Sequence, residues 1–210
     1  MWPPAALDFL RELEDNNDSD WFRANRKRYD EDLLGPTRAT AERLSDFGEP
    51  HYFRPYNNRR YRPGPPLKEH IAVAFRWAIG GFYVNLSLDG LLVAAGMFRP
   101  ARDQLERFRA AIADGRSANG FERTVDVAEG AGMSFAKPEL KRAPRGYPQD
   151  HPRVDRLRLK RMTASYLHPL ERWLHEPECD DRIRRQFEAC RPLVHWLSDT
   201  VGPSQLPARD

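Results

Sequence analysis

Apolar and polar positions alternate with two different periods along the chain, and the change of period separates helical from extended regions. Up to Gly48 the apolar residues recur every three or four positions, as on one face of a helix. This spacing predicts a first helix over 5–14, a second over 19–34, and a third that starts at Gly35-Pro36 and ends at Gly48. The first quarter of the chain is therefore expected to be helical.

The period falls to two between about residues 71 and 98, which is the pattern of β-strands with one buried face. Asp89-Gly90 lies between two such runs and predicts a hairpin with a type I′ turn. Residues 51–56 also look extended, and the proline-rich stretch 57–66 predicts a loop. Together these signals predict a small antiparallel β-meander over about residues 51–98.

Helical spacing returns after the meander. Pro100 is expected to open a helix that Gly115 ends, and further helices are predicted near 117–128, 153–175 and 180–201, the last broken at Pro192. We therefore predict an α+β fold in which N-terminal and C-terminal helices pack on the meander, as a single domain over residues 1–202. The tail 203–210 has nothing to bury and is expected to be disordered.

Composition indicates the cellular compartment of the protein and the distribution of charge along the chain. The chain has no apolar run of roughly 18 residues, as a membrane span needs, and no secretory signal pattern at its start, so we expect a cytoplasmic protein with reduced cysteines and no membrane partner. Its formal net charge is only +3. Residues 137–161, however, hold nine cations against three anions, and this run predicts a local positive field.

Functional side chains concentrate in the segment 141–152, a loop stiffened by three prolines. Arg142 and Arg145 have the fork geometry that binds a carboxylate or phosphate, and Lys141 adds a point charge. The alternative is a solvated basic loop that covers the sheet. Asp150 and His151 are candidates for an orienting carboxylate and an acid–base group, although Asp150 would equally serve as a helix cap and His151 as a surface residue.

A second cluster lies on the loop that leads into the strand starting at Ile71 and contains Arg59, Arg60, Arg62, Lys68 and His70. If this cluster met the 141–151 segment in space, the donors would suit a phosphate, a sulfate, a carboxylate or a nucleic-acid backbone. The alternative is again a solvated loop, paired with the acidic N-terminal third of the chain.

Asn25 is a polar residue on an apolar helical stripe, so its amide needs a hydrogen-bond partner, either inside the protein or on a ligand. Sequence motifs for phosphate loops, dinucleotide-binding loops and zinc sites are absent from the chain, so the sequence predicts no metal ligands and leaves any cofactor open.

Several blocks along the chain resemble a bacterial and fungal family known as domain of unknown function 2461. The blocks are Phe9-Leu10 through Asn16-Asn17, Trp21-Phe22 with Arg28-Tyr29, Gly80-Gly81-Phe82-Tyr83-Val84, Ala95-Gly96-Met97-Phe98, and Leu140-Lys141-Arg142-Ala143-Pro144-Arg145-Gly146-Tyr147 through Asp150-His151-Pro152. The resemblance spans about residues 5–202 and implies a shared fold, but the family has no assigned activity. The chain departs from the family pattern at 57–66, where an Arg-Asp pair is replaced by Asn57-Asn58.

The leading hypothesis from the sequence is a protein, with enzyme activity left open, that binds a small anionic molecule between the two basic segments. Its predicted ligand-binding residues are Arg59, Arg60, Lys68, Lys141, Arg142, Arg145 and Asn25, and its predicted catalytic residues are His70, Tyr147, Asp150 and His151. Two alternatives remain open: a nucleic-acid-binding protein that uses residues 137–161, and a non-enzymatic scaffold. Neither the reaction nor the oligomeric state follows from the sequence.

Overall fold

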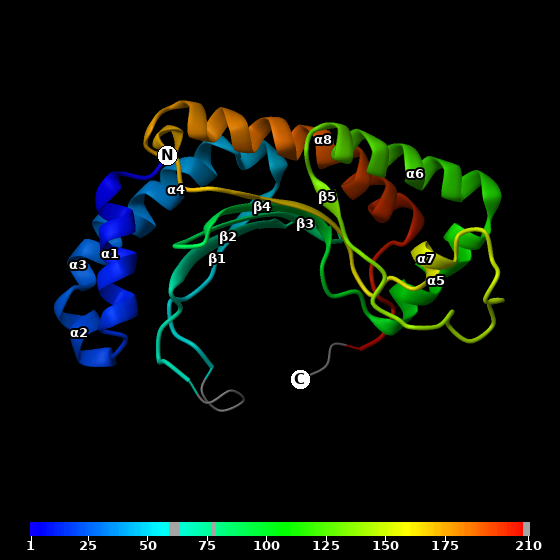
Figure 1. Cartoon of the computed structure of the whole chain (residues 1–210), viewed down its shortest axis with the longest axis horizontal. Coiled ribbons are helices and arrows are strands. Elements are labelled where there is room, and N and C mark those ends of the chain that lie inside the picture. The colour runs from blue at the N-terminus through cyan, green and yellow to red at the C-terminus, as the bar shows by residue number, and fades with distance from the viewer. Residues whose placement is uncertain (59–63, 77–78, 208–210) are drawn as a thin grey trace. The chain divides into compact units, whose positions relative to one another are not determined.

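Helices precede and follow a set of β-strands in the computed structural model, which describes residues 1–58, 64–76 and 79–207 (Figure 1). In chain order the elements are α1 (Pro4–Asp15), α2 (Ser19–Ala24), α3 (Arg26–Arg28), the π-helical turn η1 (Tyr29–Leu34), α4 (Gly35–Arg43), the 3-10 turn η2 (Ser45–Phe47), β1 (Glu49–Tyr52), β2 (His70–Arg76), β3 (Gly81–Ser87), β4 (Gly90–Met97), α5 (Arg102–Ala113), α6 (Gly115–Gly130), β5 (Ser134–Phe135), α7 (Val154–Leu157), β6 (Met162–His168), the 3-10 turn η3 (Arg172–His175) and α8 (Glu178–Thr200).

The strands form one antiparallel sheet in the order β1-β2-β3-β4-β6-β5. The α+β class is thus confirmed, and strands β1 to β4 are neighbours in sequence order, as a meander requires. The two further strands were not predicted. In β5, Ser134 pairs with Ser165 and Phe135 with Ala164 of β6.

The predicted helix over 153–175 is wrong. Only Val154–Leu157 is α-helical, and residues 162–168 form β6. Met162 and Ala164 are buried while Thr163 and Ser165 are half-buried, which is a strand pattern of period two. The interpretation failed because a strand of this length offers too few alternations to outweigh the helical spacing of its neighbours.

Two finer predictions also need correction. Helix α8 runs through Pro192 without a break, because the residues after the proline, among them Leu193 and Leu197, are fully buried. The hairpin between β3 and β4 is present. Gly90 has a φ of 143°, but Asp89 does not have a positive φ, because the described residues with positive φ are all glycines. A type I′ turn needs positive φ at both central residues, so the turn is of another type.

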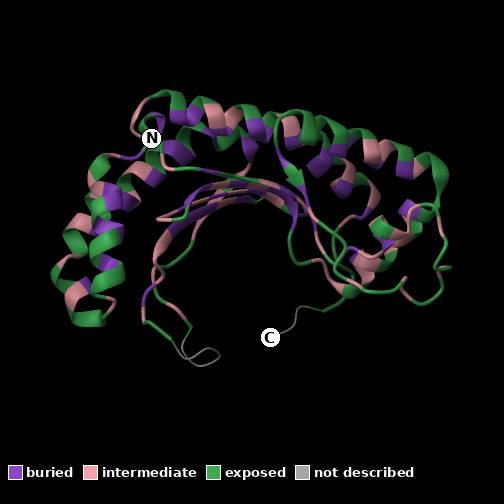
Figure 2. Cartoon of the chain, in the orientation of Figure 1, coloured by how far each residue is buried: buried purple, intermediate pink, exposed green. Residues whose placement is uncertain are grey.

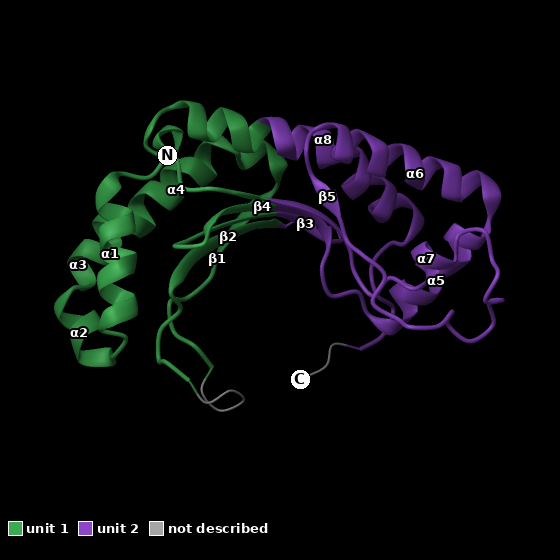
Figure 3. Ribbon diagram, in the orientation of Figure 1, with its two compact units in different colours: residues 1–75, 83–93, 167–184 green, residues 76–82, 94–166, 185–210 purple. Residues whose placement is uncertain are grey.

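The chain divides into two compact units, which Figure 3 shows in different colours. Unit 1 comprises residues 1–75, 83–93 and 167–184, and unit 2 comprises 76–82, 94–166 and 185–210. Elements β2, β3, β4, β6 and α8 each contribute residues to both. The single-domain organisation predicted for residues 1–202 stays a prediction.

The core of unit 1 follows from the helical stripe of α1. Its apolar positions, Leu7 and Phe9 among them, are all buried, as the spacing predicted (Figure 2). The Phe9 ring lies 6.0 Å from that of Tyr29, and Tyr29 in turn lies 5.1 Å from Phe22, so α1, α2 and η1 share one aromatic cluster. Asp18 caps α2 by accepting from the backbone N–H groups of Asp20 and Trp21.

The core of unit 2 is a second aromatic cluster, centred on Phe121 of α6. Its ring lies 5.3 Å from Phe108 of α5, 5.0 Å from Trp196 of α8 and 5.6 Å from Phe135 of β5. Three consecutive elements and the distant helix α8 therefore meet at one buried side chain.

The C-terminal segment is held to α5 as far as the structure describes it. Asp103 accepts hydrogen bonds from the Gln205 backbone N–H at 2.7 Å and from the Ser204 hydroxyl at 2.8 Å. The Gln205 bond is the main reason that the pKa of Asp103 falls to about 2. Residues 208–210 of the predicted disordered tail lie outside the described residues.

Candidate functional site

The best-defined polar site lies in unit 1, where the chain beyond β1 runs antiparallel to the chain before β2. The Phe53 N–H donates to the Ala72 carbonyl at 3.2 Å, the Lys68 N–H to the Pro55 carbonyl at 2.7 Å, and the Asn57 N–H to the Pro66 carbonyl at 2.8 Å. We call this pair of segments, Phe53–Asn57 and Pro66–Ala72, the arm. It extends the β1–β2 pairing and so fixes the direction of the residues that follow.

Asn17, between α1 and α2, anchors the arm. Its side-chain oxygen accepts from the Leu67 N–H at 3.0 Å, and its amide donates to the Leu67 carbonyl at 3.1 Å and to Glu69 Oε1 at 2.7 Å. Leu67 is fully buried, so its backbone groups need these partners. The sequence indicated only a helix break at Asn17, because a contact over fifty residues leaves no local pattern.

A polar groove of about 500 Å³ lies beside the arm. Its lining comes from unit 1 throughout and consists of Asn57, Pro65, Leu67, Lys68, Glu69, His70, Asn85, Ser87, Asp89, Leu92 and Leu167. Asn85 and Ser87 occupy the half-buried positions of β3 that alternate with the buried Val84 and Leu86, so strand geometry turns them away from the core.

Lys68 is the cation of the groove. Its Nζ donates to the Arg54 carbonyl at 2.6 Å and lies 5.9 Å from the centre of the Phe53 ring. Burial, and then the nearby Arg54 charge, lowers the pKa of Lys68. Within the described residues, no carboxylate lies at ion-pair distance from this ammonium, since Glu69 accepts from Asn17 instead.

His70 follows at the start of β2 and lines the same groove. Its pKa is lowered, mainly because burial disfavours the charged imidazolium and secondly because Lys68 repels it, while Glu69 acts in the opposite direction. A lowered pKa makes the imidazole neutral at pH 7, which is the form able to accept a proton.

The described lining holds one cation, Lys68, against two carboxylates, Glu69 and Asp89. The groove thus has a cationic end at Lys68 and hydrogen-bonding groups elsewhere. Arg59 and Arg60, two of the predicted ligand-binding residues, lie outside the described residues.

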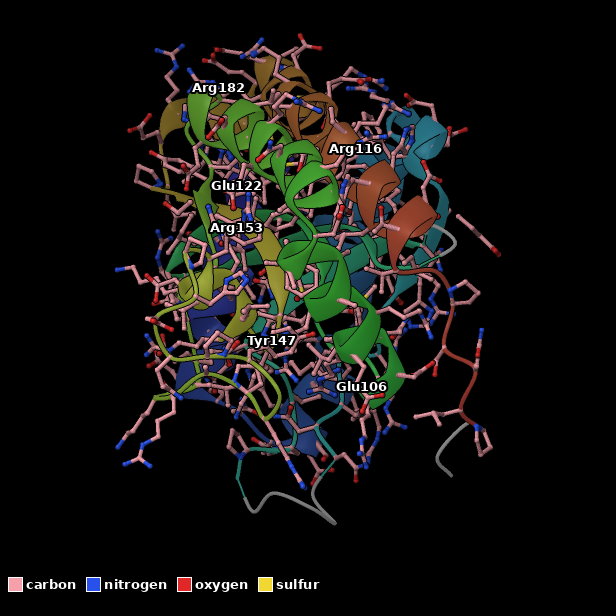
Figure 4. All side chains as sticks on the ribbon, turned by 90° about the vertical axis from the view of Figure 1, so that its right-hand side faces the viewer. Glu106, Arg116, Glu122, Tyr147, Arg153 and Arg182 are labelled. Atoms are coloured by element: carbon pink, nitrogen blue, oxygen red, sulfur yellow. The ribbon has the colours of Figure 1, made fainter. Side chains whose placement is uncertain are left out.

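The second predicted cluster lies in unit 2. Lys141, Arg142 and Arg145 are exposed, and among the residues that the structure describes none of them has a carboxylate at ion-pair distance. Tyr147 is half-buried and is labelled in Figure 4. It lies close enough to Arg109 of α5 to raise the pKa of that guanidinium, although burial has the larger effect and lowers the pKa of Arg109. Arg109 was not predicted, since it appeared only as one more surface position on a helix.

The bond at His151 Nδ1 comes from the backbone and not from the Asp150 carboxylate, which was predicted to orient the imidazole. The Arg153 backbone N–H donates to His151 Nδ1 at 3.0 Å, as at the start of a helix. This bond makes Nδ1 an acceptor and leaves Nε2 as the nitrogen that carries hydrogen in the neutral ring. Acid–base roles for these two residues stay predictions.

Asn25 has local partners for both ends of its amide. Its Nδ2 donates to the Trp21 carbonyl at 3.0 Å, and its Oδ1 accepts from Arg28 at 3.4 Å. Ligand contact by Asn25 stays a prediction. Its internal pairing is the structural alternative that the sequence left open.

The described residues of the two basic clusters belong to different units, and the meeting of the clusters stays a prediction. Over residues 1–58, 64–76 and 79–207, no three His, Cys, Asp or Glu side chains are grouped as a metal site would need. None of the helices in the described ranges is long and apolar enough to cross a membrane. Cys179 and Cys190 are free and buried.

A family model described as "Conserved hypothetical protein (DUF2461)" matches residues 5–196. The chain belongs to the DUF2461 family. No curated protein and no solved structure matches it. Membership in DUF2461 covers both units and both basic clusters, but the family description names no activity, so function has to be argued from the residues themselves.

Proposed function

We propose that the protein binds a small ligand carrying a phosphate or carboxylate group in the unit 1 groove, with Lys68 at the anionic group and His70 beside it. The observation that carries the proposal is the state of Lys68. Lys68 is a half-buried residue that lines the groove, and its ammonium donates to a carbonyl oxygen rather than to a carboxylate. A desolvated charge without a counter-charge is costly, and a bound anion would offset that cost.

Two arginines of unit 1 differ from Lys68 in this respect. Arg28 lies 2.6 Å from Glu12, and Arg184 lies 2.9 Å from Asp46. These arginines are neutralised within the protein, so they offer little to a ligand. Lys68 is the cation in the described lining of the groove, and it is not neutralised by a carboxylate there, so we assign the recognition of a negative group to it.

The remaining lining suits the rest of such a ligand. Asn85 and Ser87 supply an amide and a hydroxyl, and Asp89 supplies a carboxylate that can accept from a ligand hydroxyl or amine. His70 lies in the same groove, and burial lowers its pKa, which favours the imidazole form that accepts a proton, so general acid–base catalysis is the reaction class that we propose for this site.

The test uses sulfate as the probe, because its charge does not change between pH 5 and 8. We expect sulfate to shift the His70 Cε1–H resonance of the full-length protein, and Lys68→Ala to weaken sulfate binding about 10-fold, as removal of one charge-assisted hydrogen bond predicts. Lys27→Ala, which removes an exposed lysine of unit 1, is the matched control and should leave affinity unchanged.

The same resonance tests the electrostatics of the groove. Without sulfate, His70 should titrate below 6.5, and Lys68→Met should move that midpoint upward because it removes a repelling charge. A sulfate titration that leaves the His70 resonance in place, or a Lys68→Ala variant that binds sulfate as the wild type does, would contradict the proposal.

A second candidate function, nucleic-acid binding, is favoured by the charge state of the unit 2 loop. Three arginines downstream of the loop are neutralised within the unit, in the pairs Arg156–Glu122, Arg158–Asp155 and Arg161–Glu139. Figure 4 labels Glu122 of α6, the partner in the first pair. Lys141, Arg142 and Arg145 lack such partners among the described residues and are exposed, as phosphate-binding side chains must be.

If this candidate is right, a single-stranded oligonucleotide will be retarded in a gel at about 50 mM salt and released as salt rises. The double variant Arg142→Ala, Arg145→Ala should lower the salt slope by about two, because each arginine would neutralise one phosphate. Arg161→Ala removes an arginine that is already paired with Glu139 and serves as the control. Absence of retardation at about 50 mM salt would exclude this function.

A further inference from the structure

We propose that the groove continues into an aromatic subsite at Phe53, so that its ligand is an anionic compound with a planar, unsaturated ring. This inference rests on the proposed function, because Lys68 would hold the anionic group of the same ligand. The proposed function specifies only the anionic group of the ligand, and this inference specifies the chemical class of the rest of the molecule.

A backbone hydrogen bond to β2 fixes the position of Phe53, whereas its side chain is not buried in the core. It follows β1 and remains bonded to β2 through its N–H, but its side chain is 39% exposed. A phenyl ring that a hydrogen-bonded strand pair holds in place and leaves partly exposed is available to contact a ligand.

Two other rings support Phe53 without covering it. His51 lies 5.1 Å away at an interplanar angle of 85°, and Tyr83 lies 6.0 Å away at 74°. Both rings are nearly perpendicular to that of Phe53, and no ring among the described residues is stacked parallel on it. His51 and Tyr83 therefore contact Phe53 by edge-to-face geometry, and the Lys68 ammonium lies over the ring, so a planar ligand ring would stack on Phe53 beside this cation.

The aromatic cluster is connected to the groove at two points. Lys68 lines the groove and places its Nζ 5.9 Å from the Phe53 ring centre. Asn85 also lines the groove and donates from Nδ2 to the Tyr83 hydroxyl at 3.0 Å. A ligand whose anionic group contacts Lys68 is thus within a few bonds of the Phe53 ring, and all of these residues belong to unit 1.

The test compares two probes of equal charge and similar size, phenyl phosphate and cyclohexyl phosphate, by titration calorimetry. Only the first has a planar π-system. We expect the wild-type protein to bind phenyl phosphate about 2- to 10-fold more tightly, the range that an aromatic pair contributes beyond burial of area. Phe53→Leu should bring the ratio to about one with cyclohexyl phosphate affinity unchanged, and Phe53→Trp should restore the preference.

Two further variants separate this inference from the proposed function. Lys68→Ala should weaken both probes equally and keep their ratio, while Phe98→Leu, which alters an exposed phenylalanine of unit 2, should change neither. Equal binding of both probes by the wild type, or a preference that survives Phe53→Leu, would overturn the aromatic subsite and leave the anion site intact. Failure of both probes to bind would overturn the two proposals together.

Discussion

Gly96→Ala is expected to abolish stable folding of the strands in unit 2. Gly96 of β4 has a φ of 119°, and a Cβ atom at this position would lie 2.1 Å from the Met162 carbonyl oxygen of β6. Both the conformation and the close approach require glycine, and the obstacle is backbone, which cannot rotate away. We expect a decrease of more than about 4 kcal/mol in the free energy of unfolding, measured by urea denaturation followed by circular dichroism.

Gly130→Ala is the matched control for this substitution. Gly130 is the last residue of α6 and has no other atom within 4 Å of the position that a Cβ would take. Because alanine favours the helix and restricts the unfolded chain, we expect stability to rise or stay equal, by at most about 1 kcal/mol. A Gly96→Ala protein as stable as the control would show that β4 and β6 do not approach this closely.

Phe121→Ala is expected to cost about 3–5 kcal/mol in the free energy of unfolding, because it empties the centre of the unit 2 core. The side chain is fully buried and packs against rings from three other elements. The guanidinium of Arg156 also lies 5.8 Å from its ring centre, so the substitution removes a cation–π interaction as well. Urea denaturation monitored by Trp196 fluorescence would measure the change close to the site.

The comparison variant for Phe121 is Val127→Ala on the same helix. Val127 is 50% exposed, so its truncation removes little buried area and should change stability by no more than about 0.5 kcal/mol. Phe121→Leu should lie between the two, since leucine retains part of the buried volume. If Phe121→Ala and Val127→Ala had equal stabilities, the aromatic cluster could not be the centre of this core.

The stability predictions and the functional proposals concern different parts of the molecule. Gly96 and Phe121 act in unit 2, whereas Lys68, His70 and Phe53 line or adjoin a groove whose residues all belong to unit 1. The Phe53→Leu and Lys68→Ala variants alter side chains outside the buried core, so their effects on ligand binding can be measured on folded protein.

Sequence reasoning selected Lys68 and His70 as candidates because clustered cations and a histidine before a strand are visible locally. It could not assign their state. Lys68 is a half-buried ammonium, and His70 has a lowered pKa, because the arm places both beside each other in one groove. Burial and partner charges depend on residues distant along the chain, so neither pKa direction follows from a motif.

The residues that sequence reasoning missed share a physical cause. Asn17 looked like a helix break, but it holds the arm through Leu67, fifty positions away. Phe53 was assigned only to an extended segment, and its exposure follows from the path of the chain after β1. Such roles arise from interactions between distant segments, which leave no periodicity behind.

Local patterns alone sufficed for the α+β class, the helix α1 and the strands β1 to β4, because periods of 3.6 and two reflect which face of each element is buried. Tertiary structure decided the remainder: that residues 162–168 form a strand rather than a helix, that α8 continues through Pro192, and that Lys68 lacks a carboxylate partner among the described residues. The reason is energetic. Pairing with β4 and β5 outweighs local propensities of a few tenths of a kcal/mol per residue, and burial of the residues after Pro192 offsets the cost of about 3 kcal/mol that a proline carries inside a helix.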